Sequence, residues 1–507
     1  MNLVDSKSNG VTLNLRWSPY FEILRASGIY SLAIIVQRLA SILLVPLYTR
    51  YLTPKDYGVL ELLDLTVSVF TMLAGGSFAS ALFYHYFESD QVENRKKIVS
   101  TTLLGSILLG LIGSAIGCLV SSPLSILIFN SDQYSLYFRI LFVNLAVSLP
   151  LEACLSWLKA INRPGAFMTA SILRLVLAIA LNAILLISFH MSIDGVLWST
   201  LICSSITALA LMVYCFSANR IHFDLRLFLR LFKYSVPIGL SGLALFVIHF
   251  ADRFFLQRYA TLSDIGIYSL GYKLGMLISY VHTSFHTYWS TQIYQLVRGE
   301  KGSRMITEVF TYLGLVLTFC AVVIVVFAEA ALELLATPAF RSAVQVVPWI
   351  AAAYVLRGFG DFFRCLFFVE NRPGLDARLN WTGAAFCFAL YCVLIPKFKL
   401  LGAAAATTLT FLFVGLLALH WTHKLRPFTL EWARLIKIGV AAMLAVVVFA
   451  GTPRPTLFTS AAIAVVSCSV YPLVLIVLGF LNNKEKYAVK MIFARLFRRA
   501  SPVLDRL

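Results

Sequence analysis

Charged residues interrupt long apolar stretches of this sequence at helical spacing. Arg357, Asp361 and Arg364 stand at positions i, i+4 and i+7 of one such stretch, so a helix places them on one face. In hydrocarbon each charge costs about 2.5–3.5 kcal/mol, which lipid-facing positions cannot bear repeatedly. We therefore expect most of these side chains to line a hydrated cavity.

The charges predict two kinds of binding site. Basic residues at mid-depth suit an anionic substrate such as a phosphate group, and the candidates are Arg38, Arg253, Lys273, Arg357 and Arg364. Acidic residues in the same stretches could carry protons or sodium ions in exchange, and the candidates are Glu61, Asp64, Glu152 and Asp361. The alternative for both sets is ion pairing that locks helices together, for example between Arg357 and Asp361.

The sequence lacks the residue groupings that metal binding, nucleophilic catalysis and ATP binding need. His282 and His286 have the i, i+4 spacing of a metal pair, but no third ligand accompanies them, and neighbouring hydroxyls indicate a polar cavity face. No Ser, His and Asp grouping stands out as a nucleophile system, and no phosphate-cradling G-x-x-x-x-G-K-[ST] is present. We expect no catalytic residues, no metal and no cofactor, so that any transport is secondary.

The composition indicates the elements that must position these charges. Of 507 residues, 60% are apolar and 13% are charged, with a mean hydropathy of +0.83. A soluble protein carries about 25% charged residues, so one soluble core cannot absorb this excess of apolar residues. The sequence predicts an all-α polytopic membrane protein. Apolar runs of about 20 residues give about fourteen transmembrane helices.

The basic residues orient the predicted helices. The net charge is +18, which in a membrane protein is expected in cytoplasmic loops beside anionic lipid rather than on a nucleic-acid partner. With the N-terminus inside, loop Lys and Arg favour the cytoplasmic side by roughly four to one. We therefore predict a multi-pass protein of the bacterial cytoplasmic membrane with both termini in the cytoplasm.

The sequence contains an internal duplication. Residues 50–58 (RYLTPKDYG) match residues 258–266 (RYATLSDIG) at an offset of 208, and residues 162–165 (NRPG) recur as residues 371–374 at an offset of 209. An even number of helices in each copy predicts two parallel six-helix lobes with a site between them. The motifs themselves are interpreted as structural, with Thr53 and Thr261 as helix N-caps and each NRPG as a turn.

These patterns divide the chain into five segments. They are a cytoplasmic segment 1–27, an N-terminal lobe 28–218 with helices one to six, a C-terminal lobe 219–422 with helices seven to twelve, two further helices in 423–480, and a basic tail 481–507.

The stretch from Arg38 to Leu63 resembles the opening of bacterial polysaccharide flippases of the Wzx type, in the multidrug/oligosaccharidyl-lipid/polysaccharide exporter superfamily. The resemblance implies that an undecaprenyl-pyrophosphate-linked oligosaccharide is flipped from the cytoplasmic to the outer leaflet by alternating access, without ATP hydrolysis. It also implies membrane lipids, a polysaccharide polymerase and chain-length machinery as partners. By helix count, Arg38 and Lys273 match basic cavity positions of related flippases.

Two other functions remain open. A multidrug or cation exporter of the same superfamily would have twelve helices and a mainly acidic cavity. A membrane-embedded glycan polymerase or ligase would need a sizeable outer loop with catalytic residues, and the longest outer segment here, about residues 328–345, is short.

Overall fold

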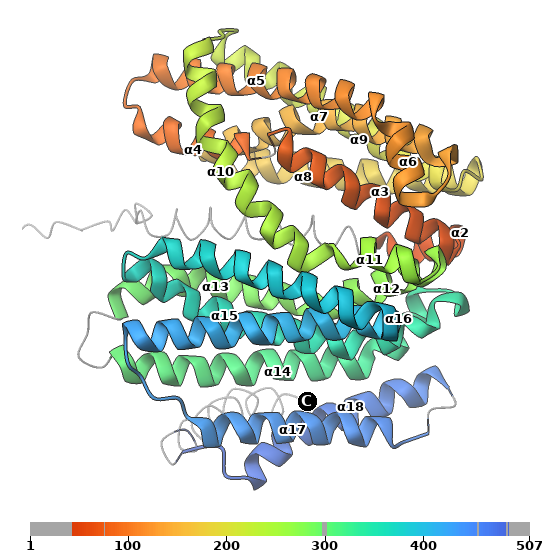
Figure 1. The fold of residues 1–507 in the computed structure, drawn as a ribbon, viewed down its shortest axis with the longest axis vertical. Helices are drawn as coiled ribbons and strands as arrows, with labels where there is room; N and C mark the ends of the chain where they lie inside the picture. Colours follow the sequence, from red (N-terminus) through yellow and green to blue (C-terminus); the bar gives the residue numbers. More distant parts are fainter. Residues whose placement is uncertain (1–42, 76, 297–301, 454–455, 483–484, 486–507) are drawn as a thin grey trace, which may run out of the picture. The chain divides into compact units, whose positions relative to one another are not determined.

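The described part of the chain is built of helices. The computed structural model describes residues 43–75, 77–296, 302–453, 456–482 and 485, and within these residues no β-strand occurs. The helices of the first half are α2 (Val45–Tyr51), α3 (Pro54–Leu73), α4 (Phe78–Glu88), α5 (Val92–Leu119), α6 (Ser121–Phe129), η1 (Asp132–Tyr134), α7 (Ser135–Ala160), α8 (Pro164–Ala183), η2 (Ile184–Ser188) and α9 (Ile193–Asn219). The remaining helices are α10 (Leu225–Phe250), α11 (Asp252–Tyr259), α12 (Leu262–Gly275), α13 (Ile278–Leu296), α14 (Gly302–Leu335), η3 (Pro338–Gln345), α15 (Val347–Val369), α16 (Pro373–Leu425), α17 (Trp432–Ala450) and α18 (Leu457–Val477) (Figure 1).

The helices confirm a polytopic membrane protein of the all-α class. Ten helical segments of the described chain are long and apolar enough to cross a membrane, or eleven if the bent pair η3 and α15 is one span. The predicted count of about fourteen is approximate, and its first span lies outside the described residues. The predicted eighth span is the pair α12 and α13, which meet at a break around Met276.

Helix α16 covers two of the predicted spans. Its backbone is non-helical at Lys399, where φ is 47°. A Cβ on Gly402 would lie 2.3 Å from the carbonyl oxygen of Leu394, so the two arms approach closely just beyond the break. The 53-residue segment is therefore two helices joined by a sharp turn, as the sequence predicts.

The chain gathers into two compact units, each made of separate segments. The first unit includes Ala74–Cys118 and Phe142–Val236, and the second includes Val45–Leu73, Leu119–Leu141 and the chain from Pro237 onward. Helix α10 passes from one unit to the other between Val236 and Pro237. The predicted lobes 28–218 and 219–422 are a division of the sequence and stay a prediction. The terminal segment 1–27 and most of the tail lie outside the described residues.

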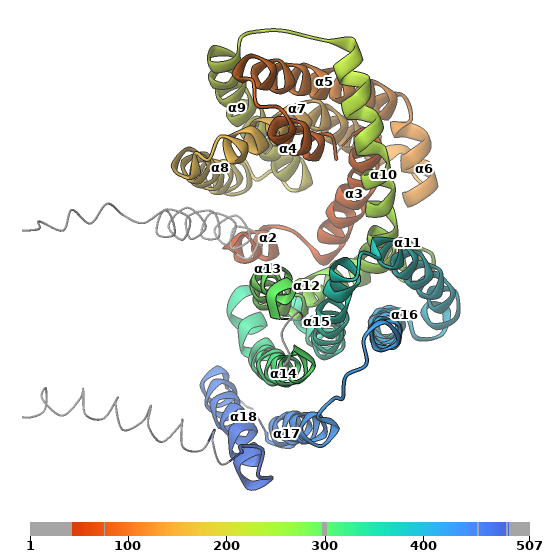
Figure 2. The ribbon, with the colours of Figure 1, turned by 90° about the vertical axis from the view of Figure 1, so that its left-hand side faces the viewer.

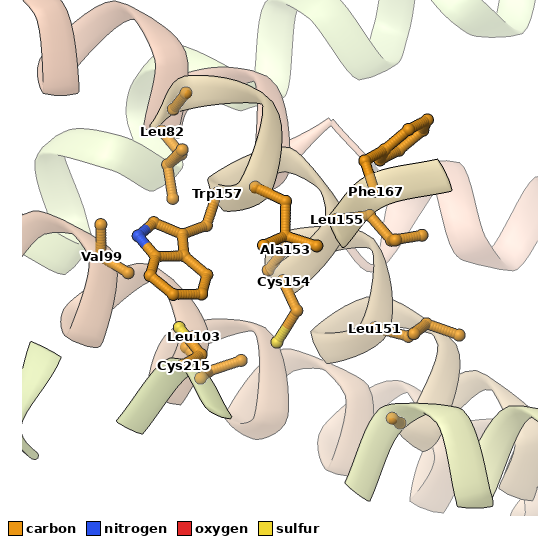
Figure 3. Packing of buried hydrophobic residues seen from close by; sticks show 13 residues of the cluster. Leu82, Val99, Leu103, Leu151, Ala153, Cys154, Leu155, Trp157, Phe167 and Cys215 are labelled. Carbon is orange, nitrogen blue, oxygen red and sulfur yellow. The ribbon is translucent and has the colours of Figure 1, made fainter. Parts of the chain in front are cut away.

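The first unit packs around α7. The Trp157 indole lies among Leu82 of α4 and Val99 and Leu103 of α5, all of them buried (Figure 3). Residues of α8 and α9 complete this core, including Phe167. Burial of such side chains contributes about 25 cal/mol per Å² where water, rather than lipid, is the alternative surrounding.

The second unit is organised around α14 and α15. Helix α15 contacts α13, α14 and α16, and α14 also contacts the C-terminal pair α17 and α18 (Figures 1 and 2). Small buried residues on α17, Ala441 and Ala445, allow close packing of this pair against Val322 and Val326 of α14. Arg434, at the start of α17, pairs with Glu431 at 3.1 Å and with Glu485 at 3.0 Å.

The two copies of the duplicated motif meet within the second unit. A Cβ on Gly58 of α3 would lie 2.0 Å from the Leu262 carbonyl oxygen, and one on Gly266 of α12 would lie 2.0 Å from the Pro54 carbonyl oxygen. The contacts are reciprocal, because Pro54 and Leu262 are themselves related by the offset of 208. Glycine at both positions lets the two helix backbones approach more closely than any side chain permits. The motif therefore forms a pseudo-symmetric helix crossing.

Each copy of this motif also begins its helix in the same way. Thr53 Oγ1 accepts the Asp56 backbone N–H at 3.2 Å, and the Asp56 carboxylate accepts the Thr53 backbone N–H at 3.0 Å. Thr261 and Asp264 repeat this capping box at 3.1 and 3.0 Å. Such boxes satisfy backbone donors that the first turn leaves free.

The NRPG motif turns one helix into the next at both of its positions. Asn162 and Asn371 adopt left-handed backbone conformations, with φ of 52° and 54°. Pro164 and Pro373 then begin α8 and α16. Asparagine tolerates the left-handed conformation that ends a helix, and proline has no N–H to lose at the first helical position. The structural interpretation of both motifs agrees with this geometry.

Candidate functional site

A network of charged and aromatic side chains runs through the second unit. It begins at Glu61 on α3, whose carboxylate lies 3.7 Å from Arg253 Nε and 3.4 Å from Lys273 Nζ. Lys273 on α12 also donates to the Tyr57 hydroxyl at 2.9 Å. The glycine crossing of α3 and α12 places these partners within reach of one another.

Arg253 is the buried centre of this part of the network. Its side chain is 1% exposed and donates to Asp252 at 2.8 Å and to the His249 carbonyl at 3.0 Å. Its guanidinium lies over the Tyr272 ring at 4.0 Å. Acids, a carbonyl and an aromatic face compensate most of this buried charge, while Nε has no hydrogen-bond partner among the described residues. Arg253 therefore has the surroundings of a structural residue.

Tyrosine hydroxyls extend the network from α12 to α15. Tyr272 and Tyr354 place their hydroxyls 3.3 Å apart, and Tyr354 is also 3.3 Å from His249 Nδ1. Both tyrosines are buried. Arg357, one helical turn further along α15, lies 5.6 Å from the Tyr354 ring centroid.

A cavity of about 400 Å³ opens at the other end of the network. Its polar lining comes from α13, α15 and the first turn of α16, and consists of His282, Thr283, His286, Ser290, Tyr294, Arg357, Asp361, Arg364, Cys365 and Asp376. Polar side chains in a membrane-spanning segment belong on a hydrated surface, because hydrocarbon offers them no hydrogen bonds. This cavity is the candidate functional site.

Asp361 is the central acid of the cavity. Its carboxylate lies 3.1 Å from Arg364, 3.4 Å from Arg357 and 3.8 Å from His282. Arg364 also donates to Asp376 at 2.6 Å and to Asn380 at 2.8 Å, which ties α15 to α16. Arg357, Asp361 and Arg364 therefore lie on one face of α15, as their spacing predicts. The ion pair between Arg357 and Asp361, which the sequence offered as an alternative to substrate binding, is present as well.

The network repeats one arrangement twice. An acid is shared between a well-held arginine and a second cation that is partly exposed. Asp361 serves Arg364 (17% exposed) and Arg357 (33%), while Glu61 serves Arg253 (1%) and Lys273 (40%). If Arg357 or Lys273 leaves its acid for another anion, the buried arginine still compensates that acid. The arrangement therefore supplies two releasable cations at a low electrostatic cost.

The remaining predicted residues lie apart from the cavity or outside the described chain. Arg38 lies outside the described residues. Asp64 is exposed on α3, one turn beyond Glu61. Glu152 is on α7 of the first unit, where its 56%-exposed carboxylate pairs with Arg174 of α8 at 3.8 Å. Glu152 and Asp361 thus occupy matching places in the duplicated sequence but have different surroundings.

Several members of the network carry no signal in the sequence. Tyr57, Tyr272 and Tyr354 are indistinguishable from ordinary apolar-face aromatics before folding. Asp376 and Asn380 follow the NRPG turn at i, i+4 spacing, and this spacing is the one cue that they share a helix face. Among the described residues, no three His, Cys, Asp or Glu side chains gather as a metal site requires.

The chain belongs to the polysaccharide biosynthesis protein family, whose model matches residues 23–288. Among characterised folds it is similar to the lipid II flippase MurJ in an inward closed conformation, with a TM-score of 0.72 and 12% identity over 88% of this chain and 97% of that one. It is also similar to an inward-facing multidrug resistance MATE family transporter of the MOP superfamily, with a TM-score of 0.62 and 15% identity over 80% and 97% of the two chains.

In sequence, the chain is similar to an uncharacterized membrane protein of Methanocaldococcus jannaschii, 20% identical over 293 residues. The match covers 56% of this chain and 57% of that relative. At these identities the structural likenesses show the fold alone. The family membership and the helices together place the chain among multi-pass membrane proteins of polysaccharide biosynthesis.

Proposed function

We propose that this protein flips an undecaprenyl-pyrophosphate-linked oligosaccharide from the cytoplasmic to the outer leaflet of a bacterial cytoplasmic membrane. The movement is alternating access without ATP hydrolysis. The observation that carries the proposal is the cavity of the second unit. It is a polar, partly cationic site among membrane-spanning helices, in a chain that belongs to a family of polysaccharide biosynthesis.

The releasable cations match the charged part of such a substrate. A pyrophosphate accepts hydrogen bonds from guanidinium and ammonium groups, and arginine binds phosphate in a bidentate manner. On arrival of the pyrophosphate, Arg357 exchanges its 3.4 Å contact with Asp361 for the phosphate oxygens, and Arg364 retains Asp361. Lys273 has the same freedom beside Glu61.

The hydroxyl groups of α13 match the sugar part. Thr283 lines the cavity and donates to the Ser279 carbonyl at 2.6 Å, which leaves its oxygen free to accept from a sugar hydroxyl. Ser290 and Tyr294 line the same cavity. A sugar headgroup would otherwise lose its hydrogen bonds in hydrocarbon, at several kcal/mol for each unsatisfied group.

The membrane potential favours outward movement of the substrate. Two negative charges crossing a potential that is negative inside gain about 2.3 kcal/mol per charge per 100 mV. Proton or sodium exchange at Glu61, Asp64, Glu152 or Asp361 would add to this gain. Partners are then the lipid-linked oligosaccharide, membrane lipids, and the polymerase and chain-length machinery that consume the product.

The test is deletion of the gene in its host, followed by complementation with variants. Loss of surface polysaccharide with lipid-linked repeat units retained in the inner leaflet supports the proposal. Accumulation of unpolymerised units in the outer leaflet would indicate a polymerase or ligase. Intact polysaccharide with new drug sensitivity would indicate a multidrug exporter, which the MATE likeness makes the second candidate.

Variants separate the site from the fold. Arg357→Gln and Lys273→Gln are expected to abolish complementation while protein abundance and melting temperature stay at the wild-type level. Arg378→Gln is the matched control, since Arg378 is exposed on α16 and does not line the cavity. Full complementation by both Arg357→Gln and Lys273→Gln would contradict the assignment.

A further inference from the structure

A second polar cavity lies within the first unit and shares no residue with the network described above. It measures about 500 Å³ and forms where α4 ends and α5 and α10 begin. Ligand sites of small molecules and headgroups have volumes of about 300–1,000 Å³. Its ionisable lining residues are His85, Glu88, Lys97, Asp224, Arg226 and Arg230.

The three cations of this cavity are not held in salt bridges. Lys97, Arg226 and Arg230 are exposed, and within the described part of the chain none of them forms an ion pair. The cations of the network in the second unit, by contrast, each pair with an acid: Arg253, Lys273, Arg357 and Arg364. Free lysine and arginine side chains around one concave surface are the usual means by which proteins bind phosphate.

The two carboxylates of the cavity are occupied by other groups. Glu88 pairs with His85 Nδ1 at 2.9 Å. The Asp224 carboxylate accepts the backbone N–H groups of Leu227 at 3.1 Å and Arg226 at 2.8 Å as the N-cap of α10. These backbone hydrogen bonds lower the pKa of the Asp224 carboxyl. Both carboxylates are thus held by other groups and form no salt bridge with the three cations among the described residues, although the charge of Arg226 also acts on Asp224.

His85 lines the same cavity and has one ring nitrogen without a partner in the described part of the chain. The residue is 8% exposed, and its Nε2 is buried without a hydrogen-bond partner among the described residues. The rings of Tyr84 and Tyr234 stack on each other at 4.8 Å, and the imidazole packs edge-on against both, with centroids 5.0 and 5.8 Å away. A buried polar atom without a partner is rare and needs an explanation.

The walls of the cavity are held in place before any ligand arrives. Ser100 Oγ on α5 accepts the His222 N–H at 2.8 Å, and Thr101 Oγ1 accepts the Asp224 N–H at 3.3 Å, so the segment before α10 is fixed to α5. Beneath it, Phe228 packs against Gly105, where a Cβ would lie 2.7 Å from the ring. A site formed in advance loses little entropy on binding.

We propose that this cavity binds the phosphate or diphosphate group of a lipid headgroup at the membrane surface. Lys97, Arg226 and Arg230 would hold the phosphate oxygens. The segment that carries Lys97 and the segment that carries Arg226 and Arg230 belong to the basic loops that the charge distribution assigns to the cytoplasmic side. Headgroup phosphates are available there. The proposal goes beyond the transport function, because it assigns a separate binding site in the first unit.

Native mass spectrometry of the purified full-length protein tests the proposal. The probes are phosphatidylglycerol, undecaprenyl diphosphate and inorganic pyrophosphate, each titrated separately. The triple variant Lys97→Gln/Arg226→Gln/Arg230→Gln is expected to bind the two lipids at least about tenfold more weakly, which corresponds to about 1.4 kcal/mol. The control Arg163→Gln/Arg220→Gln/Lys233→Gln removes the same charge from exposed residues outside the cavity, and is expected to bind as the wild type does.

Each result decides one part of the proposal. Equal losses in the two triple variants would overturn the site, because only net charge would then matter. Tighter binding of inorganic pyrophosphate than of either lipid would overturn the lipid source. If the triple variant does not fold, Arg230→Gln alone serves the same comparison, because Arg230 is exposed.

Discussion

The glycine crossing of α3 and α12 gives a sharp prediction about stability. In Gly58→Ala the new Cβ would lie 2.0 Å from the Leu262 carbonyl oxygen and 3.0 Å from the Gly266 nitrogen. Real Cβ atoms essentially never approach within 3.0 Å of a heavy atom, so the two helices must separate by about 1 Å. Both obstructing groups are backbone atoms, which cannot rotate away as a side chain would.

The expected cost follows from two opposing effects. Overpacking of this kind destabilises by about 1–3 kcal/mol, and the gain in helix propensity from glycine to alanine returns up to about 1 kcal/mol. We expect a net loss of about 2 kcal/mol and a melting temperature lowered by about 4–8 °C. The double variant Gly58→Ala/Gly266→Ala should lose less than the sum of the two single variants, since one separation of the helices relieves both clashes.

The assay is thermal unfolding of the detergent-solubilised protein, followed by size-exclusion fluorescence. Gly165→Ala and Gly374→Ala are the matched controls. They lie in the second duplicated motif, and a Cβ added at either position would have no atom within 4 Å, so their melting temperatures should stay unchanged or rise slightly. A folded Gly58→Ala protein as stable as the wild type would refute the close crossing, as would an equal loss in the controls.

Two other predictions test the charged network and the helix caps. Arg253→Leu leaves Asp252 and Glu61 without their buried cation and should lower the free energy of unfolding by about 3–5 kcal/mol. Little folded protein should then elute at the wild-type volume in size-exclusion chromatography. A wild-type yield of folded protein would show that the pairing is dispensable. Thr261→Val removes one half of the capping box on α12 and should lower stability by about 1 kcal/mol, while Thr261→Ser should retain it; equal melting temperatures of the two variants would contradict the cap.

Local features of the fold could be predicted from the sequence. The capping boxes depend on Thr and Asp three residues apart, and the NRPG turns depend on residues that end one helix and begin the next. The apolar runs established an all-α membrane protein, because no other spanning structure satisfies its backbone within a short segment. The i, i+4 and i+7 spacing placed Arg357, Asp361 and Arg364 on one face of α15.

The partners of these charges were decided by the tertiary structure. Glu61 and Arg253 are 192 positions apart, and nothing local to either residue indicates that they pair. The structure likewise separates Arg253, which is fully enclosed, from Lys273 and Arg357, which are partly exposed, although all are basic residues in apolar stretches.

The physical reason is the range of the interactions. Caps, turns and helix faces depend on groups within about four residues along the chain, so the sequence determines them directly. Burial and ion pairing depend on how helices cross, and the crossing of α3 with α12 depends on two glycines 208 residues apart. The sequence thus determined the helices and which charges they carry, while their packing decided which charges stay locked and which face a cavity.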